Sequence, residues 1–138
     1  MKVKVSRKAT FNAAHRLHNN NWSEEKNKIF FGKCNNPHYH GHNYTLFVSV
    51  LGQICEESGY VIDLNELKKI IDDKIINYFD HKNLNIEILE FQTLNPTLEN
   101  ILKVIYDKLR KEIAQELILS VILYETENNF AEINEGEH

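Results

Sequence analysis

The chain has 138 residues, close to the commonest size of one globular domain, so we expect a single domain over residues 1–138. Its net charge of -4 and pI near 6.0 show no basic excess, and we therefore expect no nucleic-acid partner and no membrane partner. The N-terminus alternates charged and apolar residues, unlike a signal peptide, and no apolar run reaches the ~20 residues of a membrane span. These features predict a cytoplasmic protein.

Two stretches near the N-terminus alternate in the way that is typical of half-buried strands. In the first, apolar residues fall at odd positions between Val3 and Phe11, and in the second they fall at even positions between Tyr44 and Val50. The polar segment between them, residues 16–39, has no clear periodicity. A stretch of that length inside a small domain is usually a functional loop, so we expect part of a site there.

Two helices and a hairpin are predicted to follow. Apolar residues recur at the helical period from Leu64 to Tyr78 and again after Thr97, which is suited to be the N-cap of the second helix. The segments 117–127 and 129–133 are strand-like and flank a turn. This order predicts an α+β fold in which an antiparallel sheet carries both helices on one face.

Three histidines are candidate metal ligands. His40 and His42 stand two apart at the start of the second strand, so both side chains point to the same face. His15 ends the first strand, and antiparallel pairing would bring it to that pair. Three imidazoles that leave a fourth position open are typical of catalytic Zn²⁺. An HxH pair by itself also occurs as hydrogen-bonded surface residues, and we leave His38, beside Pro37, out of the metal shell.

Three further side chains suit acid–base chemistry. Cys34 needs a base or a nearby cation to act as a proton acceptor, and Asp80 with His81 can supply one. A pair of this kind just past a helix is also a common C-terminal cap. Glu125 is in phase with the apolar residues of its strand, so it can direct a carboxylate to the buried face; a solvent-facing glutamate is the alternative.

Six motifs, in order and spacing, resemble the 6-pyruvoyl-tetrahydropterin synthase and 6-carboxytetrahydropterin synthase family: FNAAHRL, FGKCNNPHYHGHNYTL, VIDLNELKK, DHKNLN, NPTLENI and LYETENN. The resemblance covers nearly the whole chain. It implies a tunnelling fold, in which each subunit has a four-stranded antiparallel sheet with two helices. Trimers of such subunits close a twelve-stranded β-barrel, and two trimers stack into a homohexamer.

The resemblance also implies a role for each candidate residue: Zn²⁺ ligands His15, His40 and His42, the catalytic thiol Cys34, its partners Asp80 and His81, and the pterin anchor Glu125. We add Thr97 to the substrate-binding residues. In family members the pocket lies between subunits, so Cys34 and His81 can come from different chains. The implied substrate is 7,8-dihydroneopterin triphosphate, and three cations flank the motifs as candidate ligands of its triphosphate: Arg16, Lys33 and Lys82.

The resemblance leaves the reaction open between relatives. The pyruvoyl-forming enzyme of tetrahydrobiopterin biosynthesis eliminates triphosphate, whereas 6-carboxy-5,6,7,8-tetrahydropterin synthase of the queuosine pathway also releases acetaldehyde. The long CNNPHYHGH spacing favours the pyruvoyl-forming reaction. A folate-pathway group carries an acidic residue where this chain has Cys34. A zinc-binding module without catalysis is the remaining alternative, although such a module would need neither Cys34 nor Glu125.

Overall fold

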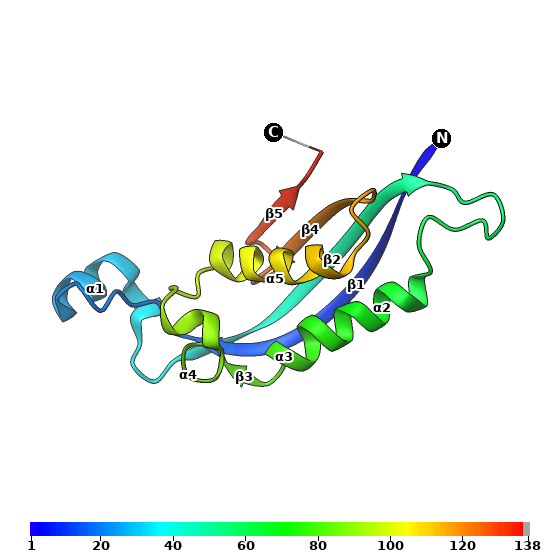
Figure 1. Ribbon diagram of the computed structural model, residues 1–138. Coiled ribbons are helices and arrows are strands. Elements are labelled where there is room, and N and C mark those ends of the chain that lie inside the picture. Colours follow the sequence, from blue (N-terminus) through cyan, green and yellow to red (C-terminus); the bar gives the residue numbers. More distant parts are fainter. Residues whose placement is uncertain (137–138) are drawn as a thin grey trace.

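Two long antiparallel strands carry the histidines. In a computed structural model that describes residues 1–136, β1 (Lys2–His15) and β2 (His40–Gln53) pair over their full lengths, so that His15 lies opposite His40 (Figure 1). On β2, alternate side chains from Tyr44 to Val50 are buried and those between them are more exposed. The two strands predicted from the alternation are therefore confirmed.

The sheet has five strands in the order β3-β1-β2-β4-β5. The predicted closing hairpin is β4 (Ile118–Tyr124) and β5 (Phe130–Asn134), and β4 pairs antiparallel with β2. The four predicted strands pair antiparallel, but the expectation of a sheet made of these four alone was wrong, because a fifth strand, β3 (Lys82–Asn83), pairs parallel with Ala13 and Ala14 at the edge of β1. A strand of two residues has no periodicity of its own, so only its tertiary contact defines it.

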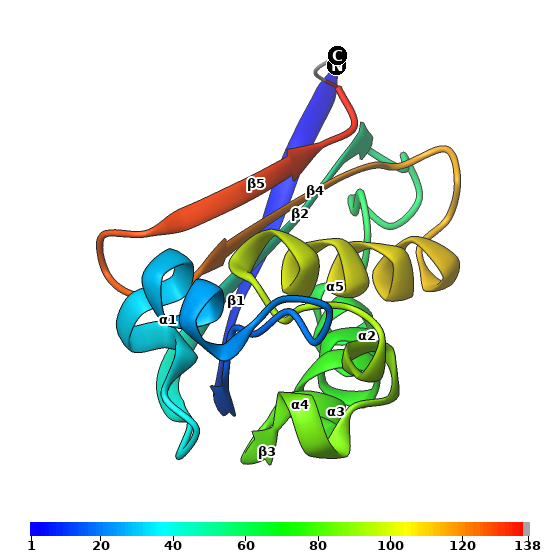
Figure 2. The same cartoon turned by 90° about the vertical axis from the view of Figure 1, so that its left-hand side faces the viewer.

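Helices cover one face of this sheet (Figure 2). The predicted helix over residues 64–78 is present as a continuous helical segment made of α2 (Leu64–Ile71), a π-helical turn η2 (Asp72–Ile76) and α3 (Asn77–Phe79). The π turn was not predicted. The second predicted helix is α5 (Leu98–Glu112). No helix within residues 1–136 is long and apolar enough to cross a membrane.

The core lies between the sheet and these helices. Its fully buried side chains come from both layers and include Leu46, Leu67, Ile75, Ile105 and Leu123. Burying an aliphatic side chain of this size contributes about 1.5–3 kcal/mol, so the core fixes the positions of β1, β2 and β4 relative to the helices. The short elements α4 (Leu84–Glu87) and η3 (Leu89–Gln92) complete the helical layer.

The predicted loop over residues 16–39 contains a helix that the sequence pattern did not reveal. It folds into α1 (Glu24–Phe31) and the 3-10 turn η1 (Gly32–Asn35), at the end of the sheet where β1 ends and β2 begins (Figure 1). Ser23 caps α1 with its side chain. Only Asn27 of this helix is buried, so α1 has no apolar stripe to detect.

Candidate metal centre and active site

His15, His40 and His42 converge at the end of the β1–β2 pair. Their ring centroids are 4.5 Å apart for His15 and His40, 5.1 Å for His15 and His42, and 5.0 Å for His40 and His42. One ligand atom from each side chain lies within 4.8 Å of the other two. The convergence expected from strand pairing is therefore observed, because the register places His15 opposite His40 and His42 follows two residues later on the same face.

The tautomer of His15 is set by the backbone. Its Nδ1 lies 2.8 Å from the Pro96 carbonyl oxygen, which can only accept, so Nδ1 carries the proton and Nε2 keeps its lone pair. His15 Nε2 and His40 Nδ1 are both buried without a hydrogen-bond partner within residues 1–136. Leaving a buried polar atom without a hydrogen-bond partner lowers the folding stability by about 1–3 kcal/mol. A bound cation would remove this cost.

Burial keeps two of the imidazoles neutral. It lowers the pKa of His15 to about 4, against the opposing effect of the Pro96 hydrogen bond, and positive charge on His40 or His42 would lower it further. The pKa of His40 is lowered by burial and by His42. At neutral pH both rings therefore offer lone pairs, which is the form that binds metals. Three nitrogen donors of this kind fit Zn²⁺ with one position left for another ligand.

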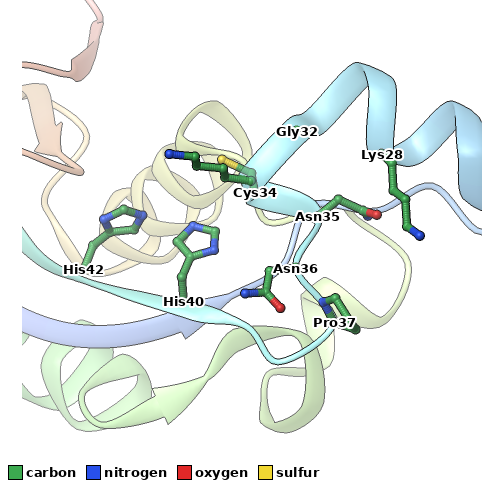
Figure 3. A pocket seen from close by; sticks show the side chains of 9 residues that line it. Lys28, Gly32, Cys34, Asn35, Asn36, Pro37, His40 and His42 are labelled. Carbon is green, nitrogen blue, oxygen red and sulfur yellow. The ribbon is translucent and has the colours of Figure 1, made fainter.

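A cavity of about 500 Å³ opens beside the histidines (Figure 3). Figure 3 shows Cys34 across this cavity from His40 and His42, and Lys28 directed away from both rings. Cys34 is half-buried, and its backbone oxygen accepts a hydrogen bond from the Leu17 N–H at 2.8 Å, which brings η1 back to the end of β1. Nine residues line the cavity: Lys28, Gly32, Lys33, Cys34, Asn35, Asn36, Pro37, His40 and His42.

A second cavity, of about 620 Å³, also includes His42 and is lined by Glu125 and Phe47. Glu125 Oε2 lies 3.9 Å from His15 Nε2, and the Glu125 side chain is 20% exposed. The carboxylate thus faces the histidines, as the strand phase predicted, and not open solvent. It does not belong to the group of ligand atoms that converge within 4.8 Å. The two cavities therefore share His42, with a thiol on one side and a carboxylate on the other.

Tyr44 lies directly beneath the histidines. It is fully buried, and its hydroxyl has no hydrogen-bond partner within the described residues. Burial raises its pKa, and the nearby Glu125 and Cys34 raise it further. Its ring stacks on Phe11 at 5.0 Å. The sequence pattern identified Tyr44 only as a core residue of β2.

Asp80 and His81 form a pair outside both cavities. Asp80 Oδ1 accepts a hydrogen bond from the Asn12 N–H at 2.8 Å, and this bond is the main reason that the pKa of Asp80 is lowered. Asp80 Oδ2 lies 3.0 Å from His81 Nδ1. The His81 side chain is 82% exposed, and its backbone has a φ of 60°. Within residues 1–136 of one chain, this pair is not brought to Cys34.

The remaining predicted residues fall in different places. Thr97 is confirmed as the N-cap of α5, since its hydroxyl accepts from the Asn100 N–H at 3.2 Å, but it lines neither cavity. Lys33 lines the Cys34 cavity. Arg16 donates from Nε to the Asn35 carbonyl at 2.9 Å, and Lys82 lies in β3. Lys28, in the same cavity as Lys33, was missed because α1 was not predicted.

Comparison with known proteins identifies the family of the chain. The 6-pyruvoyl tetrahydropterin synthase family matches residues 4–136. Human 6-pyruvoyl tetrahydrobiopterin synthase is 41% identical over 135 residues, which cover 98% of this chain and 92% of the human chain. The 6-carboxy-5,6,7,8-tetrahydropterin synthase of Rickettsia conorii is 28% identical over 153 residues, which cover 95% of this chain and 99% of the Rickettsia chain.

Among solved structures, that of Caenorhabditis elegans 6-pyruvoyl tetrahydropterin synthase superposes with a TM-score of 0.91 at 36% identity, covering 97% of this chain and 96% of the nematode chain. The mixed sheet with helices on one face is thus a tunnelling fold. The chain belongs to the 6-pyruvoyl tetrahydropterin synthase family.

Proposed function

We propose that this chain is a zinc-dependent 6-pyruvoyl-tetrahydropterin synthase, a lyase that converts 7,8-dihydroneopterin triphosphate to 6-pyruvoyl-tetrahydropterin with loss of triphosphate. The observation that carries the proposal is the convergence of three histidines beside a cavity that also holds the Cys34 thiol. A purely structural zinc site is closed by four protein ligands and needs no thiol outside its shell. The site is therefore that of an enzyme, which we place in the cytoplasm as a homohexamer.

In the proposed reaction a metal would activate the substrate, and residues of this chain would transfer its protons. Zn²⁺ held by His15, His40 and His42 would make the hydroxyls and the adjacent carbon-bound protons of the substrate side chain more acidic. Cys34, across the cavity from two of these ligands, is placed to accept and return protons along that side chain. Positioned acid–base groups typically contribute about 10² to 10⁴ in rate.

The two cavities suggest how the substrate is oriented. Glu125 is a charged acceptor that suits the amide and amine edge of a pterin, and it lies on one side of His42. Lys28 and Lys33 line the cavity on the other side, where positive charge suits a triphosphate. The pterin would therefore lie toward Glu125 and the triphosphate toward the lysines, with the diol between them at the histidines. Thr97 lines neither cavity of one chain, so its assignment to the substrate remains a prediction from the sequence.

Asp80 and His81 complete the proposal through a neighbouring subunit. The Asp80 carboxylate holds the exposed His81 ring through Nδ1, which leaves Nε2 free to contact another molecule. A nucleophile, a base and an orienting acid act only when they are within hydrogen-bond reach. We infer that His81 of one subunit approaches Cys34 of the next.

The alternative reaction is that of 6-carboxy-5,6,7,8-tetrahydropterin synthase on the same substrate. Greater identity to the human pyruvoyl-forming enzyme, 41% against 28%, supports the first reaction over this one. So does the six-residue separation of Cys34 and His40. Both reactions release triphosphate, so triphosphate alone does not distinguish them.

The test is to incubate the zinc-loaded protein with 7,8-dihydroneopterin triphosphate and to identify the products by mass spectrometry. We expect triphosphate and 6-pyruvoyl-tetrahydropterin without acetaldehyde. Acetaldehyde with a carboxylated pterin would establish the alternative reaction, and absence of any turnover would overturn both.

A Cys34→Ala variant separates an enzyme from a zinc-binding module. We expect it to keep its zinc and lose at least about 100-fold in kcat, because the thiol acts on protons and not on the metal. Cys55→Ala is the matched control, since Cys55 is exposed and lines neither cavity. Equal turnover by Cys34→Ala and Cys55→Ala would remove the thiol from the mechanism.

A further inference from the structure

The Tyr44 hydroxyl is a buried donor that the proposed reaction does not use. The residue is 0% exposed, and no side chain or backbone group within residues 1–136 accepts from its hydroxyl. Buried hydroxyls in folded proteins nearly always have a partner. An unpaired buried phenol is therefore available to donate to a group that does not belong to this chain.

The sheet register places Tyr44 beside the candidate metal ligands, although its side chain lines neither cavity. Tyr44 follows His42 by two residues on β2, so both side chains point to the same face. Thr45 pairs with Tyr124 across β2 and β4, and extending this antiparallel register by one residue sets Tyr44 opposite Glu125. The Tyr44 ring lies 5.7 Å from the His42 ring and 6.3 Å from the His15 ring.

Packing alone does not explain a tyrosine at this position. The ring stacks on Phe11, which shows that a phenylalanine side chain is accommodated in this layer. A phenylalanine in place of Tyr44 would keep that stacking without burying an unpaired polar atom, so the hydroxyl has a use other than filling the core. A phenol is neutral at physiological pH and therefore donates a hydrogen bond.

We propose that Tyr44 is a further substrate-binding residue, whose phenol O–H donates a hydrogen bond to an oxygen of the molecule that lies between the three histidines and Glu125. The identity of that molecule as the pterin substrate rests on the proposed function. The hydrogen bond forms only in the complex, so Tyr44 contributes to affinity and orientation and not to the stability of the free chain.

The test compares Tyr44→Phe with the wild type in three measurements: zinc content, thermal unfolding of the free protein, and affinity of the zinc-loaded protein for 7,8-dihydroneopterin by calorimetry. We expect Tyr44→Phe to retain zinc, to unfold at the same or a higher temperature, and to bind 7,8-dihydroneopterin about 10-fold more weakly, as for one lost hydrogen bond in a site closed to water. We expect its kcat/KM for the triphosphate substrate to fall by a similar factor.

Tyr78→Phe is the matched control, because Tyr78 already donates to Glu90 Oε1 at 2.5 Å, away from both cavities. We expect this variant to show the opposite pattern, with a lower unfolding temperature and unchanged affinity for the pterin. Equal pterin affinity in Tyr44→Phe and wild type would overturn the role of Tyr44 alone, provided that the wild type binds. Failure of the wild type to bind the pterin would overturn the proposed function, and this inference with it.

A measurement on the wild-type chain covers the case in which Tyr44→Phe does not fold. The Cζ chemical shift of a ¹³C-labelled tyrosine reports hydrogen bonding of its phenol. We expect the Tyr44 signal to move when 7,8-dihydroneopterin is added, while the Tyr78 signal stays in place. An unmoved Tyr44 signal with saturating pterin would contradict the proposal.

Discussion

His15 is held more firmly than the other two candidate ligands. Its Nδ1 donates to the Pro96 carbonyl, which lies just before the N-cap of α5 and is not required by that helix. This backbone carbonyl therefore fixes the orientation of the His15 ring through Nδ1 and leaves Nε2 free. An oriented imidazole loses less freedom on binding a metal, so in the proposed zinc site His15 would contribute to metal affinity through its fixed position as well as its lone pair.

The histidine pattern makes a direct prediction about metal content. His42→Ala removes one of three nitrogen donors, and we expect zinc affinity to fall by about 100-fold or more. Zinc content by atomic emission and thermal unfolding with and without a chelator measure this loss. We expect the chelator to lower the unfolding temperature of the wild type and to have little effect on His42→Ala.

His38→Ala is the control for that experiment. His38 shares the sequence parity of His40 and His42 but is exposed, and it is not among the histidines that converge. We expect His38→Ala to retain zinc and chelator sensitivity. If His38→Ala lost zinc as fully as His42→Ala, the assignment of the three ligands would be wrong.

Among the structural elements, β5 is linked to α5 by hydrogen bonds to Glu135, the residue that follows the end of β5. Glu135 accepts hydrogen bonds from Tyr106, from Arg110 at 2.6 Å and from the Leu119 N–H at 2.9 Å. Burial acts to raise the pKa of Glu135, but these donors outweigh it and the pKa is lowered below its ordinary 4.5. The last strand is thereby fixed against the helix that also positions His15.

Glu135→Gln tests this link through pH. The lowered pKa means that the unfolded chain binds a proton more readily than the folded chain, so Glu135 stabilises the fold above pH 4.5 and this contribution is lost as pH falls through the lowered pKa. We expect Glu135→Gln to be less stable than wild type by about 1–2 kcal/mol at pH 7 in denaturant titrations. The difference should shrink at pH 3; a constant difference across pH would exclude the charge as its cause.

Prediction from sequence succeeded for elements that have a buried face. Strands β1 and β2 and helices α2 and α5 each repeat apolar residues at their own period, because each packs one face on the core. The same rule explains the failures: α1 buries only Asn27, and β3 has two residues. The π turn within the 64–79 helical segment also leaves no signal in the apolar pattern.

Site residues could be predicted from the sequence where they lie on strands that were themselves predicted. Strand parity brings His15, His40 and His42 together, and it also directs Glu125 inward. Lys28 depends on an undetected helix, and the unpaired hydroxyl of Tyr44 depends on what surrounds it in three dimensions. Sequence spacing fixes which face a side chain occupies but not whether its polar atoms find partners.

For the whole molecule, the open edges of the sheet favour assembly. β3 covers only Ala13 and Ala14 of β1, so the outer edge of β1 from residue 2 to 12 has no strand partner within the described chain, and β5 forms the opposite edge. Exposed edges of this length readily pair with another copy, and edge-to-edge pairing around an axis closes a barrel. This supports the proposed trimers, in which we propose that His81 of one subunit reaches the Cys34 cavity of another.

Mixing two inactive variants tests whether each active site is shared between subunits. Cys34→Ala and His81→Ala should each lose at least about 100-fold in turnover, because each lacks one member of the proton-transfer pair. If the thiol and the imidazole of a site come from different chains, oligomers assembled from equal amounts of both variants contain some intact sites. About a quarter of wild-type activity is then expected for random assembly around a symmetric ring.

Co-expression or joint refolding, followed by the triphosphate-release assay, provides the measurement, and each variant refolded alone is the control. If Cys34 and His81 of the same chain formed each site, every chain in the mixture would lack one group and no activity would return. We expect activity to return because of two features of the single chain. His81 is exposed and held by Asp80, and neither residue of this pair lines the Cys34 cavity.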